Sequence, residues 1–102
     1  MTDDGYHRHV ITHVVVMKLH DPADQIEAVE RLRAMEGQIP SLLSLEVLAD
    51  DLHRDGAYDI YLRSTHADDR GLVEYIEHPV HVELLQWLRP RLAARAVVDA
   101  RS

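Results

Sequence analysis

The chain has 102 residues, a mass of 11.7 kDa and a formal net charge of −7. This length fits a single domain with a modest hydrophobic core. The excess of acidic residues argues against binding to nucleic acid, which depends on Lys and Arg to neutralise phosphates. The absence of cysteine excludes disulfides, thiol nucleophiles and cysteine-ligated zinc. No apolar run is long enough to span a membrane and no signal-peptide pattern is present, so we expect a cytoplasmic protein without membrane contact.

The first half of the chain predicts a strand, a helix and a second strand. Residues 11–19 are rich in β-branched side chains, which predicts a strand covered on both faces. Asp21 and Pro22 are a start signal and Gly37 is a stop signal, so a helix is expected between them. Alternating residues over 43–49 predict the second strand. The apolar side of the helix is expected to consist of Ile26, Val29, Leu32 and Met35.

The second half of the chain predicts a hairpin, two helices and a last strand. A polar turn over 50–56 leads into a third strand over 58–65. Thr65 is expected to cap a second helix, and the His78-Pro79 pair is expected to begin a third. A short final strand is expected over 96–98.

The resulting order, β-α-β-β-α-(α)-β, is typical of an α+β ferredoxin-like fold, in which helices cover one face of a four-stranded antiparallel sheet. We expect this domain over residues 11–100, after a flexible tail over residues 1–10.

Both faces of the predicted sheet are apolar, although helices can cover only one of them. Val14 and Val16 of the first strand lie opposite Val15 and Met17. An open apolar face favours association, so we expect a homodimer that packs sheet against sheet. The alternative is a monomer in which the tail or the last helix covers that face. The second strand shows the same two-sided pattern, with Leu42 and Leu48 opposite Leu43, Leu45 and Val47.

Eight histidines occur in this small chain, and His78 and His81 are the most informative. Both lie at the expected start of the third helix, where the helix dipole disfavours imidazolium and keeps the ring neutral. A neutral imidazole suits a general base, and the hydroxyl of Tyr75 can donate a hydrogen bond to a polarised carbonyl. The alternatives are that His78 caps the helix and that His81 only lines a pocket.

His13 lies on the first expected strand, on the same face as Val15 and Met17. It points into a cavity if that face lines a space between two sheets, and otherwise it is a core histidine held by one hydrogen bond. His13, His78 and His81 can share a metal ion, but no carboxylate stands at ligand spacing, so we expect no metal. The remaining histidines are expected at the surface: His7, His9, His20, His53 and His66.

Several short segments stand in a recognisable order along the chain: ITHVVVMKL over 11–19, Ile39-Pro40, SLEV over 44–47, Tyr58-Asp59, HPVH over 78–81, Arg89-Pro90 and VVD over 97–99. As an ordered set they resemble the stress-responsive dimeric A/B-barrel (Dabb) family. The resemblance implies a ferredoxin-like protomer, a homodimer, and a cavity between the sheet and the helices of each protomer. The family includes a plant cyclase that closes a linear polyketide by intramolecular aldol condensation without a cofactor.

The resemblance carries specific roles to three positions. His81 corresponds to the general base, Tyr75 to its hydrogen-bonding partner, and His13 to a residue of the pocket wall. The chain would then be a cofactor-independent cyclase or isomerase for a polyketide-like small molecule. The alternatives are a non-catalytic stress-response or ligand-binding dimer, and a cofactor-free oxygenase or a haem or metal protein on the same barrel. The residues expected to line the cavity are His13, Val15, Met17, Leu45, Leu62, His78 and Leu84.

Overall fold

The computed structural model describes residues 10–101. They form β1 (Ile11–Leu19), η1 (Pro22–Asp24), α2 (Gln25–Arg33), β2 (Ser44–Ala49), β3 (Ile60–His66), α3 (Asp69–Glu77), α4 (Pro79–Leu88), η2 (Arg89–Arg91) and β4 (Leu92–Arg101). Except for residue 10, the tail expected over residues 1–10 lies outside the described part of the chain.

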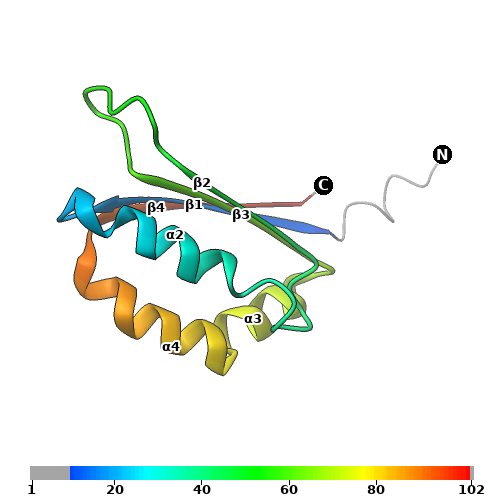
Figure 1. Cartoon of the computed structure of the whole chain (residues 1–102). Coiled ribbons are helices and arrows are strands. Elements are labelled where there is room, and N and C mark those ends of the chain that lie inside the picture. Colours follow the sequence, from blue (N-terminus) through cyan, green and yellow to red (C-terminus); the bar gives the residue numbers. More distant parts are fainter. Residues whose placement is uncertain (1–9, 102) are drawn as a thin grey trace.

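The four strands form one antiparallel sheet in the order β2-β3-β1-β4. The helices α2, α3 and α4 all lie on one face of this sheet, and no helix between residues 10 and 101 covers the other face (Figure 1). This is the α+β ferredoxin-like arrangement that the order of the elements predicted. No helix in this part of the chain is long and apolar enough to cross a membrane.

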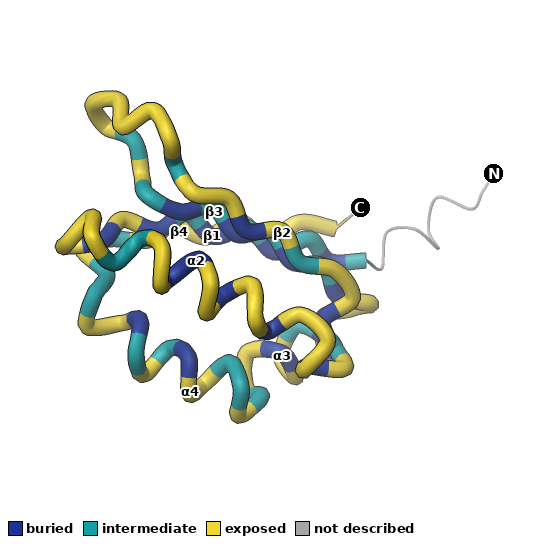
Figure 2. The backbone as a smooth tube through the Cα atoms, viewed as in Figure 1, coloured by how far each residue is buried: buried dark blue, intermediate teal, exposed yellow. Residues whose placement is uncertain are grey.

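The hydrophobic core lies between the sheet and the helices. Every second residue of β1 from Ile11 to Leu19 is buried, as expected for a strand with one face on a core. His13 is one of these buried residues, so its face looks toward the helices. Of the two possibilities left open for this face, a space between two sheets and the core, the structure shows the core side. Figure 2 shows the buried segments along the strands and helices, and the exposed loop that joins β2 to β3.

The first helix begins where the sequence predicted, but it is shorter. The carboxylate of Asp21 accepts a hydrogen bond from the Ala23 N–H at 2.9 Å and caps η1. Three residues of the predicted apolar side are buried in α2 or just after it, whereas Ile26 is 74% exposed. A series spaced by three residues drifts around a helix by about 60° at each step, which carries its first member away from the core. Gln25 makes the polar contacts of this first turn.

The connection between α2 and β2 corrects the predicted face of two leucines. Leu42 is buried and Leu43 is exposed, the reverse of the expected assignment. The alternation cannot be extended back to residue 43, because the regular strand begins only at Ser44. Within β2, Val47 is buried and Leu48 is exposed, as the alternation predicted.

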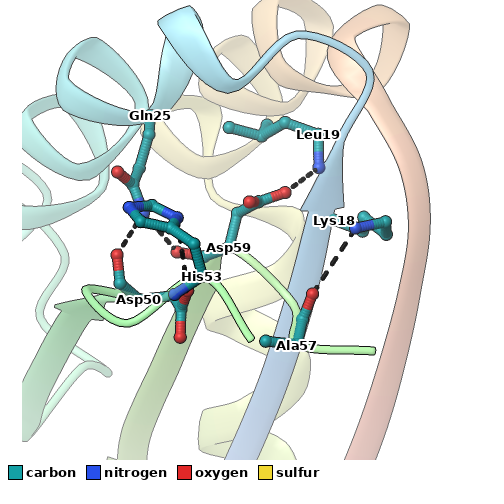
Figure 3. A network of polar contacts seen from close by, with 7 residues as sticks. All are labelled: Lys18, Leu19, Gln25, Asp50, His53, Ala57 and Asp59. Carbon is teal, nitrogen blue, oxygen red and sulfur yellow. Dashed lines mark hydrogen bonds and ion pairs between the residues drawn. The ribbon is translucent and has the colours of Figure 1, made fainter. Parts of the chain in front are cut away.

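A small polar network anchors the projecting β2–β3 loop at its base (Figure 3). The amide nitrogen of Gln25 donates hydrogen bonds to the carbonyl oxygens of Asp50 at 3.0 Å and Asp59 at 2.8 Å. The Asp59 carboxylate accepts a hydrogen bond from the Leu19 N–H at 2.7 Å. Both ends of the loop are thus tied to α2, and the Asp59 end is also tied to β1. Because Asp59 serves this network, β3 begins at Ile60 rather than at residue 58.

The caps and ends of the later elements also differ from the prediction. The carboxylate of Asp68, not the Thr65 hydroxyl, caps α3 and accepts a hydrogen bond from the Gly71 N–H at 2.8 Å. β3 continues through His66, one residue beyond its predicted end. The last strand spans residues 92–101 rather than 96–98, because it pairs with β1 over almost its whole length.

Candidate functional site

A cavity of about 350 Å³ lies between the sheet and the helices. Side chains of β1, β3 and β4 form its floor, and side chains of α2, α3, α4 and η2 form its walls. Most of the lining is aliphatic, which is typical of a site for a small organic molecule. The titratable residues of the lining are His13, Tyr75, His81, Arg89, Arg95 and Asp99.

The cavity brings together most of the residues that the sequence singled out. Those that line it are His13, Val15, Met17, Leu62, Tyr75, His81 and Leu84. Leu45 does not line it and instead packs against the core. His78 does not line it either, because its Nδ1 accepts a hydrogen bond from the Val80 N–H at 3.1 Å and caps α4. Capping was the alternative interpretation of His78.

Tyr75 is the aromatic centre of the site. It lies in α3, is 1% exposed, and still lines the cavity. Its ring centroid lies 4.8 Å from that of His66 and 4.6 Å from that of His81. Burial raises the pKa of the Tyr75 hydroxyl to about 12. The hydroxyl is therefore protonated at neutral pH and can serve as a hydrogen-bond donor.

His81 is held at the cavity in one tautomer. Its Nδ1–H donates to the Ile76 carbonyl oxygen at 2.9 Å, and a carbonyl can only accept. The lone pair of Nε2 is then available for a proton. Burial lowers the pKa of His81; the hydrogen bond to Ile76 opposes this shift, and the positive charges of Arg89 and Arg95 add to it. At neutral pH the ring is consequently an uncharged base.

His13 is paired with a carboxylate across the sheet. The two strands place it opposite Asp99, and its Nδ1 lies 2.5 Å from Asp99 Oδ1. Because the carboxylate accepts, Nδ1 carries the hydrogen and the ring orientation is fixed. The His13 ring centroid lies 6.1 Å from that of Tyr75. His13 is thus both buried and part of the cavity wall.

His66 corrects the prediction that it lies on the surface, because it is 0% exposed. Its Nδ1–H donates to the Ser41 carbonyl oxygen at 2.8 Å, and its Nε2 accepts from the Ser64 hydroxyl at 2.9 Å. Burial is the main cause that lowers the pKa of His66, and the hydrogen bond to Ser41 opposes it. The third strand was predicted to end at residue 65, so the prediction missed the burial of residue 66. The alternation of Ile60, Leu62 and Ser64, continued by one step, would have placed it in the core.

Protonation of His66 is expected to make the folded protein less stable in acid. Its pKa is lower in the folded chain than in the unfolded chain, where it is about 6.5, so the unfolded state binds the extra proton. Stability should therefore fall as pH drops below about 6.5, by up to about 1.4 kcal/mol per pH unit for this one group. Urea unfolding at pH 7.5 and pH 5.5 measures the difference.

Two variants test the assignment to His66. The variant His66→Gln is expected to be less stable overall but to lose less of its stability between the two pH values. His20→Gln, at an exposed position, should keep the pH dependence of the wild type. Equal wild-type stability at both pH values would contradict the prediction.

The sequence did not predict three charged residues of the cavity: Arg89, Arg95 and Asp99. The last two lie on β4, which was predicted to be too short to include them. Arg95, Val97 and Asp99 stand at every second position. A strand extended over residues 95–99 would have placed their three side chains on one face. Across residues 10–101, no group of three or more His, Asp or Glu side chains is arranged to hold a metal ion.

The cavity thus combines an uncharged imidazole base, a protonated phenol beside it, and a second imidazole oriented by a carboxylate. Such groups can move a proton next to a carbonyl and stabilise the oxyanion that results.

Several solved structures share this fold. A dimeric ferredoxin-like protein of unknown function from Thermobifida fusca has a TM-score of 0.82 and 26% identity, over 95% of this chain and 94% of that one. A hydroxynitrile lyase from Passiflora edulis has a TM-score of 0.78 and 13% identity, over 93% and 94%. The cofactor-independent oxygenase SnoaB from Streptomyces nogalater has a TM-score of 0.71 and 16% identity, over 92% and 93%. At these last two identities the similarity shows the fold alone.

The sequence comparisons identify the family. An uncharacterised protein from Streptomyces coelicolor is 36% identical over 77 residues, which are 71% of this chain and 79% of that protein. Residues 11–102 match the family described as the stress responsive A/B barrel domain. The chain therefore belongs to the stress responsive A/B barrel (Dabb) domain family.

Proposed function

We propose that the protein is a homodimer whose cavity binds a small polyketide-like molecule and catalyses its intramolecular aldol-type cyclisation without a cofactor. His81 is the general base and Tyr75 is the hydrogen-bond donor. The observation that carries this proposal is the contact of the Tyr75 and His81 rings, with centroids 4.6 Å apart, on the wall of a largely apolar cavity.

In the proposed reaction, His81 Nε2 takes a proton from a methylene group flanked by two carbonyls. The electron pair of the broken C–H bond forms an enolate, and the Tyr75 hydroxyl donates a hydrogen bond to its oxyanion. The enolate carbon then bonds to a more distant carbonyl carbon of the same molecule. The alkoxide that forms takes the proton back from His81. The product is an isomer of the substrate, so the step needs no oxidant or reductant.

Two further features support a catalytic role for the cavity. The lining is mostly aliphatic, and in such surroundings a hydrogen bond from Tyr75 is stronger than in water and a flexible chain can be held in a folded conformation. The same fold also carries a hydroxynitrile lyase and a cofactor-independent oxygenase. The cavity volume of about 350 Å³ suits a ligand of small-molecule dimensions.

The open face of the sheet supports the homodimer. Val98 of β4 is 62% exposed there, and Val14 lies beside it in the register of β1 with β4. Val16 and Leu48 extend the same apolar surface across β1 and β2. Burying such a face against its copy is the simplest way to remove it from water. The Thermobifida fusca protein, which is similar over most of its length, is described as dimeric.

The variant Val98→Glu is expected to be a monomer at concentrations where the wild type is a dimer, because it places charges inside the proposed interface. Sedimentation equilibrium measures the change in mass. Val73→Glu, at an exposed position of α3 on the helical side of the sheet, should leave the dimer intact. A wild-type protein that sediments as a monomer would overturn the proposed assembly.

The proposed chemistry is tested by deuterium exchange at the activated methylene of a β-keto ester in D₂O, followed by NMR. Enolate formation by the protein should accelerate exchange above the buffer rate, and a longer poly-β-keto chain should then yield a cyclised product. Ligand binding without accelerated exchange would favour a non-catalytic ligand-binding dimer instead.

A further inference from the structure

We infer that the cavity recognises a carboxylate on its ligand through Arg89 and Arg95, which makes the ligand a keto acid rather than a neutral ketone or ester. This inference rests on the proposed function for the identity of the reacting group. The recognition of the carboxylate itself depends only on the arrangement of charges in the cavity.

The two arginines reach the cavity from different elements. Arg95 lies on β4 opposite Met17 of β1, on the face that looks toward the helices. Arg89 is the first residue of η2 and lies where α4 ends. Both line the cavity, and their positive charges both act on His81. They therefore form a cationic end of the cavity near the proposed base.

Neither guanidinium group is in an ion pair with a carboxylate of the described residues. Other arginines of the described chain form ion pairs with carboxylates, for example Arg101 with Asp69 at 2.7 Å. Between residues 10 and 101, no carboxylate lies within ion-pair distance of Arg89 or Arg95. Arg54 and Arg63 are likewise outside any ion pair, but of the unpaired arginines of residues 10–101 only Arg89 and Arg95 line the cavity. A guanidinium group presents paired N–H donors that match the two oxygens of a carboxylate.

The carboxylate at the other end of the cavity sets the direction in which a ligand binds. Asp99 is four residues from Arg95 on β4, which is about 13 Å along an extended strand. The negative charge of Asp99 repels an acid group of a ligand at that end of the cavity. Between the two ends, Val97 of β4 pairs with Val15 of β1 on the floor of the cavity. A ligand acid group is therefore directed to the arginines, with its apolar chain over the valines. A bound carboxylate would also offset the positive charges that lower the pKa of His81 and so strengthen the base.

The test uses two probes that differ only in charge: a β-keto ester whose alkyl chain ends in a carboxylate, and the same compound with that carboxylate methylated. Binding is measured by calorimetry, and methylene exchange is measured by NMR on the same samples. We expect the acid to bind about tenfold more tightly than its methyl ester, as for a charge-assisted hydrogen bond to a guanidinium. The preference should shrink as ionic strength rises.

The variants Arg89→Gln and Arg95→Gln should each reduce the preference for the acid, and the double variant should abolish it. Arg54→Gln, on the exposed β2–β3 loop, is the matched control and should bind both probes as the wild type does. His81→Ala should retain the preference for the acid while losing accelerated exchange.

The outcomes separate the two proposals. Equal binding of acid and ester, with exchange that depends on His81, would overturn carboxylate recognition and leave the proposed function standing. A preference for the acid that depends on the arginines, without accelerated exchange, would support this inference and overturn the catalytic role. Competition by inorganic phosphate at the same concentration as the acid would indicate a site for any small anion and would also overturn the inference.

Discussion

Replacing His81 with alanine is expected to lower the rate of methylene exchange and of cyclisation by about 10²–10⁴-fold, the usual contribution of a positioned general base. His81 is the cavity residue whose Nδ1 is already committed to the Ile76 carbonyl, so its Nε2 is the free basic atom. The variant should keep its secondary structure and its dimer, since no other described side chain donates to or accepts from His81. Exchange rates, circular dichroism and sedimentation measure the three properties.

The pH profile gives an independent check of the same role. Because burial lowers the pKa of His81, kcat/KM should fall in acid with a midpoint below about 6.5. The Tyr75 hydroxyl, with a pKa of about 12, stays protonated and should cause no loss of activity up to about pH 10. The exposed control His20→Ala should retain both the rate and the profile. If His81→Ala keeps the wild-type rate, the proposed base is wrong and His13 becomes the group to test.

The sequence predicted the fold because local signals agreed with one another. The strand predicted from the β-branched residues over 11–19, the Asp21-Pro22 start and the His78-Pro79 break are all present in the structure. Errors occurred where tertiary contacts decide an element's end. Pairing with β1 stabilises β4 along its length. The weakly apolar sequence of β4 does not by itself predict so long a strand. The cap of α3 moved to Asp68 because β3 continued beyond the predicted end.

The same boundary errors explain which parts of the site were missed. Tyr75, His81 and His13 were selected by residue type and by a family resemblance, and the structure brings them to one cavity. Arg95 and Asp99 were missed because the last strand was predicted too short. The burial of His66 follows the alternation of β3, but its partner Ser41 lies 25 residues away in the chain, so no local pattern predicts that hydrogen bond.

Replacing Tyr75 with phenylalanine is expected to reduce kcat by about 10²–10³-fold, as for loss of one donor to a developing oxyanion. The aromatic ring, which lies 4.8 Å from His66 and 4.6 Å from His81 between centroids, is retained in this variant. The loss should therefore appear in kcat with little change in KM, because the donor acts mainly on the charge that forms in the transition state.

Stability distinguishes this catalytic role from a purely structural one. Since the substitution removes only the hydroxyl, the urea midpoint of Tyr75→Phe should stay close to that of the wild type, whereas Tyr75→Ala should unfold more easily because it leaves a cavity in the core. Tyr58→Phe, on the exposed loop before β3, is the matched control and should alter neither kcat nor stability. A Tyr75→Phe variant with the wild-type kcat would show that the ring packs the site but that its hydroxyl does not stabilise the enolate.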